Sequence, residues 1–237
     1  MKISFKTFLM GTFAVAAMAS CASDGAIVVP EAPLEECVYM GDKTEFAVWA
    51  PDAEAAKLRL YRDAMDETAF KTVDMKLGKD GLWKTTVKED VKGSFYTFQV
   101  QKNGQWLEET EGIAAKAVGV NGTRGAVIDW TETDPEGWDE DKSPKIDPSD
   151  IIVYEMHHRD FSIHETSGVQ NKGKYLALTE EGTKNPDGLA TGIDHLKEIG
   201  VTYVQLLPST DFITVDEAHL ENNQYNWGYD PYNYNAV

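Results

Sequence analysis

The side chains best suited to acid–base chemistry lie in the run EMHHRD. Glu155 and Asp160 flank two adjacent imidazoles, and such groups serve as general acids and bases or as metal ligands. A structural role fits the carboxylates better, because Glu155 followed by Arg159 suits an ion pair or a solvated strand end. His157 and His158 lack partners at zinc-site spacing, so packing and hydrogen bonding are their expected roles. The alternative is that one of them lines a pocket floor.

The composition excludes several classes of partner. The 237 residues are 42% hydrophobic and 26% charged, as in an ordinary soluble globular protein. The net charge of −18 repels phosphate backbones, so we expect no nucleic-acid partner, whereas neutral ligands stay open. Two cysteines, Cys21 and Cys37, permit at most one disulfide and no structural zinc site. We therefore predict no metal site and no cofactor in this segment.

Residues 1–20 are predicted to be a signal peptide. Lys2 and Lys6 precede an uncharged apolar run that ends in small residues. A transmembrane anchor is the alternative, although a membrane span needs about 20 apolar residues. The sequence MASC, ending at Cys21, resembles a bacterial lipobox, so we expect lipidation of that thiol; an ordinary cysteine near a cleavage site is the alternative. Residues 21–37 would then tether an exported bacterial lipoprotein to a membrane, in the periplasm or at the cell surface.

Short strand-like segments separated by turn signals fill residues 38–135 and predict an immunoglobulin-like β-sandwich. The expected strands are 46–49, 57–61, 82–87, 95–100 and 125–129. Asn103-Gly104 is predicted to form a two-residue type I′ hairpin turn, because both central positions need positive φ. Asn121-Gly122-Thr123 is formally a glycosylation sequon, which we interpret as a turn.

The pattern changes after an acidic, proline-containing stretch, 136–150, which is predicted to be a linker. Residues 151–156 and 201–207 are continuous apolar runs typical of buried parallel strands. Thr191 is predicted to cap a short helix, 192–199, which the following glycine ends. Strand, helix and strand in this order predict a βαβ unit of an α/β sheet or barrel.

Several segments together resemble type I pullulanases of glycoside hydrolase family 13. FAVWAP, beginning at Phe46, and KAVGVNG, beginning at Lys116, resemble parts of the sandwich that precedes the barrel in these enzymes, carbohydrate-binding module family 48. YEMHHRDF and VQLLP resemble the first two barrel strands. YNWGYDP, at 225–231, matches the heptapeptide typical of type I pullulanase at every position.

The resemblance implies that residues 151–237 are the N-terminal part of a (β/α)8 TIM barrel, truncated after the second strand. A complete barrel takes about 250 residues. Retaining hydrolysis needs two carboxyl groups about 5 Å apart, which in this family follow later strands. We therefore assign no catalytic residue here and expect the chain to be inactive alone. The family often binds calcium, and those ligands are expected beyond Val237, in the full-length enzyme.

The resemblance also assigns a substrate-binding set. Tyr229 is expected to stack on the glucose ring next to the scissile bond, because an aromatic face suits the apolar C–H face of a sugar. Asp230 either holds a sugar hydroxyl or braces the turn. Trp227 is either a pocket wall or loop packing, and Asn226 is a turn residue first.

The implied activity of the parent is debranching, the hydrolysis of α-1,6-glucosidic linkages in pullulan, amylopectin and glycogen. One alternative is a non-catalytic surface glucan-binding lipoprotein, and another is an isoamylase or branching enzyme of the same family. The heptapeptide favours pullulanase. In the sandwich, Trp49 and Trp83 are expected in the core, and Trp106 is the candidate for an exposed glucan contact.

Overall fold

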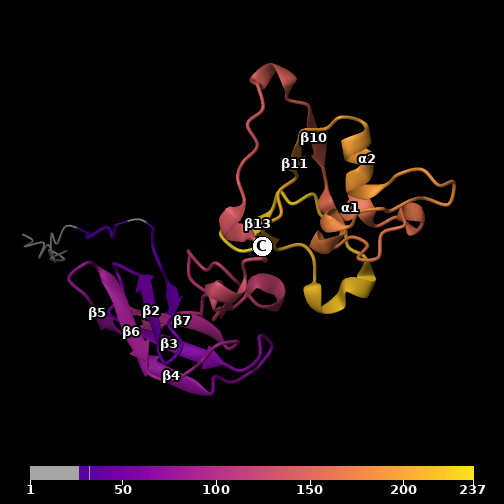
Figure 1. Ribbon diagram of the computed structural model, residues 1–237. Helices are drawn as coiled ribbons and strands as arrows, with labels where there is room; N and C mark the ends of the chain where they lie inside the picture. The colour runs from indigo at the N-terminus through magenta and orange to yellow at the C-terminus, as the bar shows by residue number, and fades with distance from the viewer. Residues whose placement is uncertain (1–26, 32) are drawn as a thin grey trace, which may run out of the picture.

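The computed structural model describes residues 27–31 and 33–237, so the predicted signal peptide and Cys21 lie outside the described residues. The indigo-to-magenta part of the chain forms two antiparallel sheets (Figure 1). One sheet has the strand order β1-β2-β6-β5, and the other has the order β4-β3-β7-β8, with β9 beside β7. The bounds are β1 Cys37–Tyr39, β2 Thr44–Trp49, β3 Ala55–Tyr61, β4 Lys71–Asp74, β5 Lys76–Leu77, β6 Leu82–Val87, β7 Phe95–Lys102, β8 Gln105–Trp106 and β9 Gly125–Ala126.

The core lies between these two sheets. Strand alternation sends one face of each strand inward, as in the burial pattern of β3. The buried members come from both sheets and include Phe46, Val48, Leu58, Leu60, Trp83, Tyr96, Phe98 and Val127. The Tyr96 ring packs edge-on against Phe46 at 5.3 Å and Phe98 at 5.4 Å between centroids. The predicted immunoglobulin-like sandwich is confirmed in its mostly-sheet, two-layer form.

Two of the three sandwich tryptophans lie where the sequence placed them. Trp83 is buried in the core, and Trp106 is 36% exposed. The prediction for Trp49 was wrong, because this side chain is only half-buried. Its position at the end of β2 takes it out of the core, and its indole N–H donates to the carbonyl of Val28 at 3.0 Å.

The structure also refines the strand boundaries. β2, β3, β6 and β7 fall within two residues of their predicted ends, whereas β9 stops at Ala126. The short strands β1, β4 and β5 were missed, because two to four residues carry too little alternation to detect. The hairpin turn is confirmed: Asn103 has φ 52° and Gly104 φ 73°, between the paired residues Lys102 and Gln105.

Short 3-10 helices connect these elements. They are η1 Val120–Gly122, η2 Trp130–Glu132, η3 Trp138–Glu140, η4 Pro148–Asp150, η5 Glu165–Ser167, η6 Tyr175–Thr179 and η7 Glu217–Asn222. Residues 136–150 contain no strand, and nearly all of them are exposed. Within the described part of the chain, no helix has the length and apolar character needed to cross a bilayer.

The second region contains the predicted strand–helix–strand unit. β10 (Val153–Met156) pairs in parallel with β11 (Tyr203–Leu206), and the segment between them includes α1 (His158–Ser162) and α2 (Gly192–Glu198). Thr191 occupies the N-cap position of α2 as predicted, but its hydroxyl donates to the carbonyl of Ser167 at 2.5 Å rather than capping the helix. Gly200, with φ 82°, follows the helix end.

The predicted burial of these two strands was wrong. Val153 is 57% exposed and Val204 is 43% exposed. A pair of strands has two free edges, and no third strand joins them among residues 27–31 and 33–237. Apolar runs of this kind are buried only where further elements cover both faces.

A second, antiparallel pair closes the C-terminal part, with β12 (Asp211–Phe212) beside β13 (Pro231–Asn233). Figure 1 shows β13 lying close to the loops at the end of the sandwich. The side-chain amide of Asn233 donates to the carbonyl of Gly122 at 2.9 Å, which joins the two regions through a buried contact.

Candidate functional site

The heptapeptide 225–231 forms a braced loop between η7 and β13. The amide nitrogen of Asn226 donates to Asp230 Oδ1 at 2.6 Å and to Thr214 Oγ1 at 2.5 Å, which uses both of its hydrogens. The amide oxygen of Asn226 accepts the backbone N–H of Gly228. Asn226 is therefore placed as the turn residue that the sequence indicated.

Asp230 braces the same turn. The Thr214 hydroxyl and then the Asn226 amide lower the pKa of its carboxyl, since both favour the charged form. Oδ1 receives the Asn226 amide, whereas Oδ2 is buried without a hydrogen-bond partner among the described residues. Of its two predicted roles, this geometry favours bracing.

The loop presents its aromatic side chains to solvent on either side of a fixed glycine. Gly228 is buried with φ 85°, and a Cβ on it would collide with the carbonyl oxygen of Pro208. Its neighbours protrude: Tyr229 is 68% exposed and Trp227 is 61% exposed. Trp227 also packs edge-on against Tyr225, at 5.2 Å between centroids. The arrangement offers a free aromatic face at a rigidly held position.

A row of stacked rings supports this loop from the end of β10. The His157 ring stacks on the rings of Tyr225 and His158, with ring centroids 5.5 Å and 5.6 Å apart. The His158 ring in turn stacks on Tyr175, at 4.4 Å between centroids. Burial, and then the neighbouring imidazole, lowers the pKa of His158, which favours its neutral form. The sequence flagged the two histidines, but nothing in it pointed to Tyr175, which lies on η6.

The carboxylates considered first do not form a pair. Glu155 is exposed on β10. Arg159 bonds to Asp160, at 3.0 Å, and to the side chain of Asn223 rather than to Glu155. The exposure of Glu155 agrees with a solvated strand end. Among the described residues, Glu155 and Arg159 form no ion pair.

The exposed tryptophan of the sandwich is partly covered. The ammonium group of Lys57 lies 3.9 Å from the centre of a Trp106 ring. A ligand stacking on that face would have to displace the cation.

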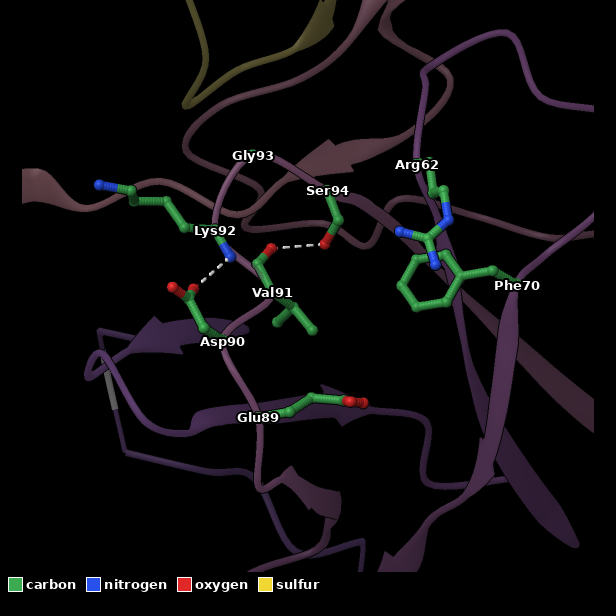
Figure 2. Close-up of a pocket in the computed structure, with 8 residues that line it drawn as sticks. All are labelled: Arg62, Phe70, Glu89, Asp90, Val91, Lys92, Gly93 and Ser94. Carbon is green, nitrogen blue, oxygen red and sulfur yellow. Dashed lines mark hydrogen bonds between the residues drawn. The ribbon is translucent and has the colours of Figure 1, made fainter.

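A hollow of about 240 Å³ on the sandwich is a weaker candidate, although Figure 2 shows polar side chains around it. The guanidinium of Arg62 lies 4.6 Å from the ring centre of Phe70 and covers that ring. Ser94 Oγ donates to the carbonyl of Val91, and Asp90 accepts the backbone N–H of Lys92. Because these polar groups are already paired with one another, the hollow offers few free partners. Across the described residues, no three His, Cys, Asp or Glu side chains gather into a metal site.

The family model of carbohydrate-binding module 48 (isoamylase N-terminal domain) matches residues 33–114. The pullulanase of Bacillus subtilis (strain 168) is 42% identical over 199 residues, which cover 84% of this chain and 27% of that protein. The chain belongs to the pullulanase family. It corresponds to an N-terminal pullulanase segment that carries the module.

Solved pullulanases share the fold of this pullulanase segment. The enzyme of Paenibacillus barengoltzii, in complex with maltohexaose and α-cyclodextrin, is 47% identical with a TM-score of 0.83, covering 89% of this chain and 32% of that one. The pullulanase of Bacillus acidopullulyticus is 42% identical with a TM-score of 0.81, covering 89% and 26%. The chain thus spans about a quarter to a third of the length of these relatives.

Proposed function

We propose that this chain supplies the carbohydrate-binding module and the first part of the catalytic domain of a debranching enzyme that hydrolyses α-1,6-glucosidic linkages in pullulan and related α-glucans. The observation that carries the proposal is the braced loop that holds Tyr229 exposed. The solved relative with maltohexaose and α-cyclodextrin supports an α-glucan as the ligand.

We place β10 and β11 as the first two strands of a (β/α)8 barrel. Their parallel register, from Val153 opposite Tyr203 to Met156 opposite Leu206, and the helical connection between them fit such a start. The loop that carries Tyr229 follows β11, and active sites of barrels form from loops at the carboxyl ends of the strands.

The retaining mechanism needs two carboxylates. We place them in the part of the longer relatives that lies beyond the position matching Val237. In this chain Tyr229 then binds and orients a glucose ring, and the acid–base steps belong elsewhere. An assay of reducing-end release from pullulan tests this division: we expect no release by the chain alone, and measurable release contradicts it. Calcium, if the full-length enzyme binds it, is placed outside this segment.

For the N-terminus, we propose cleavage before Cys21 and lipidation of its thiol, giving an exported lipoprotein held at a membrane. The support is the order of the two lysines, the apolar run and MASC in the sequence. Intact mass of the protein from its native host tests the proposal, because an unmodified Cys21 would exclude the anchor.

Affinity electrophoresis in amylopectin tests the glucan contact of Tyr229 in the whole chain. Loss of an aromatic stack should weaken binding by about tenfold in Tyr229→Ala, while Tyr229→Phe keeps the ring and most of the retardation. Tyr234→Ala is the matched control, because Tyr234 is 74% exposed nearby but lies outside the loop. Unchanged retardation of Tyr229→Ala, or its loss in Trp106→Ala instead, would refute the assignment.

A further inference from the structure

Several hydrogen bonds join the sandwich to the second region, and Asn121 takes part in them through three of its atoms. Asn121 N donates to Glu217 Oε2 at 2.8 Å, and Asn121 Nδ2 donates to Asp216 Oδ1 at 3.0 Å. In return, Asn121 Oδ1 accepts the backbone N–H of Glu217 at 2.7 Å. These bonds join positions about a hundred residues apart in the sequence, so they fix how the two regions meet.

The backbone conformation explains why an asparagine stands here. Asn121 has φ 59° and Gly122 has φ 67°, so both lie in the left-handed region. Asparagine tolerates that region better than most residues, and its side chain both donates and accepts. The bond from Asn121 lowers the pKa of Asp216, whose Oδ1 also accepts the N–H of Ala218 at the start of η7.

From Asp216 a continuous set of hydrogen bonds runs to the loop that carries Tyr229. Asp216 N donates to Gln224 Oε1 at 2.8 Å, and Gln224 Nε2 donates to the carbonyl of Thr214 at 3.3 Å. Thr214 Oγ1 accepts the amide of Asn226, the residue that braces the loop. Successive hydrogen bonds in this set share a residue, first Gln224 and then Thr214, so the position of Asp216 constrains that of Asn226.

The sandwich also holds the far side of the same loop. The carbonyl of Gly122 accepts the amide of Asn233, which donates to Asp211 Oδ2 at 2.8 Å as well. Asn233 and Asp211 are both buried, and they pair β13 with β12 directly after the heptapeptide. The neighbours Asn121 and Gly122 thus hydrogen-bond to the chain on both sides of residues 225–231.

We infer that Asn121 is a positioning residue for α-glucan binding: it acts from the sandwich module, through Asp216 and Gln224, on the conformation of the loop that presents Tyr229. The glucan part of this inference rests on the proposed function, whereas the control of loop conformation does not. In this view the module determines the shape of the binding loop in addition to any contact of its own with glucan.

The test uses the whole chain without ligand first. Asn121→Gly keeps a residue suited to positive φ but removes the side chain. We expect the NMR signals of the Asn226 side-chain amide and the Gly228 N–H to shift, with the core Trp83 indole signal unchanged. Asn103→Gly is the matched control, because Asn103 is a left-handed asparagine in the hairpin turn. Its backbone N–H donates to Glu54 within the sandwich, and among the described residues its side chain has no bond to the second region, so the variant should leave the loop signals in place.

A paired exchange provides the rescue. Asn121→Asp places a carboxylate against Asp216 and should disturb the loop as much as Asn121→Gly does. Adding Asp216→Asn restores a donor and an acceptor across the contact, so the double variant should recover the loop signals and the affinity. Both single variants at position 121 should weaken maltohexaose binding by about tenfold.

Unmoved loop signals in both Asn121→Gly and Asn121→Asp, or no recovery in the double variant, would overturn the inference. A wild-type chain that fails to bind maltohexaose would instead refute the proposed function, because the signals of the free protein still report on Asn121. Shifted loop signals with unchanged maltohexaose affinity would also overturn the inference, since positioning would then have no effect on binding.

Discussion

The Nε2 atom of His157 lies 2.8 Å from the carbonyl oxygen of Asn226. A carbonyl only accepts, so Nε2 carries the proton, and Nδ1 is left to accept the backbone N–H of Asp160 at 3.4 Å. His157 follows β10 directly, so this bond connects the end of a strand to the loop that presents Tyr229. The imidazole is therefore part of the support of the loop rather than a free acid or base.

Replacing His157 with phenylalanine should keep the stacking with Tyr225 and remove the bond to Asn226. One hydrogen bond contributes about 1 kcal/mol, so we expect a fall of about 2–4 °C in the melting midpoint. Differential scanning calorimetry measures it. His219→Phe is the control, because the His219 imidazole is exposed and lies 3.0 Å from the exposed carboxylate of Glu221. Equal midpoints for the two variants would show that the bond to Asn226 contributes nothing.

Glu36 predicts a pH dependence of stability. It is buried and accepts the backbone N–H groups of Ile113 and Ala114, and burial raises its pKa from 4.5 to about 7. The folded state then binds the proton more tightly than the unfolded state, so the free energy of unfolding falls as pH rises from about 4.5 to about 7, by on the order of 3 kcal/mol.

Urea unfolding at pH 5 and pH 8 measures this slope. Glu36→Gln should flatten it, because the amide does not titrate, and the remaining slope should reflect Glu111, whose pKa burial also raises. Glu35→Gln is the neighbouring control, since Glu35 is exposed and pairs with Lys116. If wild type is no less stable at pH 8 than at pH 5, or if Glu35→Gln flattens the slope equally, Glu36 is not the responsible group.

Local chemistry explains what could be predicted from the sequence. The turn at Asn103-Gly104 depends on positive φ at two adjacent residues, and the end of α2 depends on the positive φ of Gly200. The alternation of β3 likewise lies within the strand itself. Each of these features is decided within a few residues, so the pattern alone was sufficient.

Long-range contacts explain what the sequence could not supply. Arg159 bonds to the side chain of Asn223, 64 positions along the chain. Asn121 bonds to Asp216 and Glu217, about a hundred positions away. No local pattern in the sequence indicates either set of contacts. Glu36 stands at the end of the predicted tether, yet it is buried by segment 111–115. A charged residue in a polar stretch looks solvated until the chain that covers it is known.

The position of Phe98 in the sandwich core predicts that truncating its side chain strongly lowers stability. Its ring is fully buried against Tyr96, and its backbone N–H and C=O both pair with Thr110. Phe98→Ala should lower the free energy of unfolding by about 3–5 kcal/mol, because it leaves a cavity between the sheets. Phe70→Ala, at an exposed ring, should cost less than about 1 kcal/mol. Urea unfolding followed by far-UV circular dichroism compares them, and similar losses would contradict a core centred on Phe98.

Gly228 offers a way to separate backbone strain from the contact that fixes the binding loop. Gly228 has φ 85° and Gly137 has φ 84°, so alanine at either position carries the same left-handed penalty of about 1–2 kcal/mol. Of these two positions, the added Cβ meets a neighbour at Gly228, the carbonyl oxygen of Pro208, whereas a Cβ at Gly137 would lie in open space.

Gly228→Ala should therefore move the loop away from Pro208, displace Tyr229, and reduce retardation in amylopectin by several-fold or more. Gly137→Ala should leave retardation unchanged, because its strain lies in the stretch 136–150, far along the chain from the loop. Affinity electrophoresis of both variants, alongside their unfolding free energies, makes the comparison. If Gly228→Ala retains full retardation, the loop tolerates displacement from Pro208, and its fixed position is not what makes Tyr229 available to a glucan.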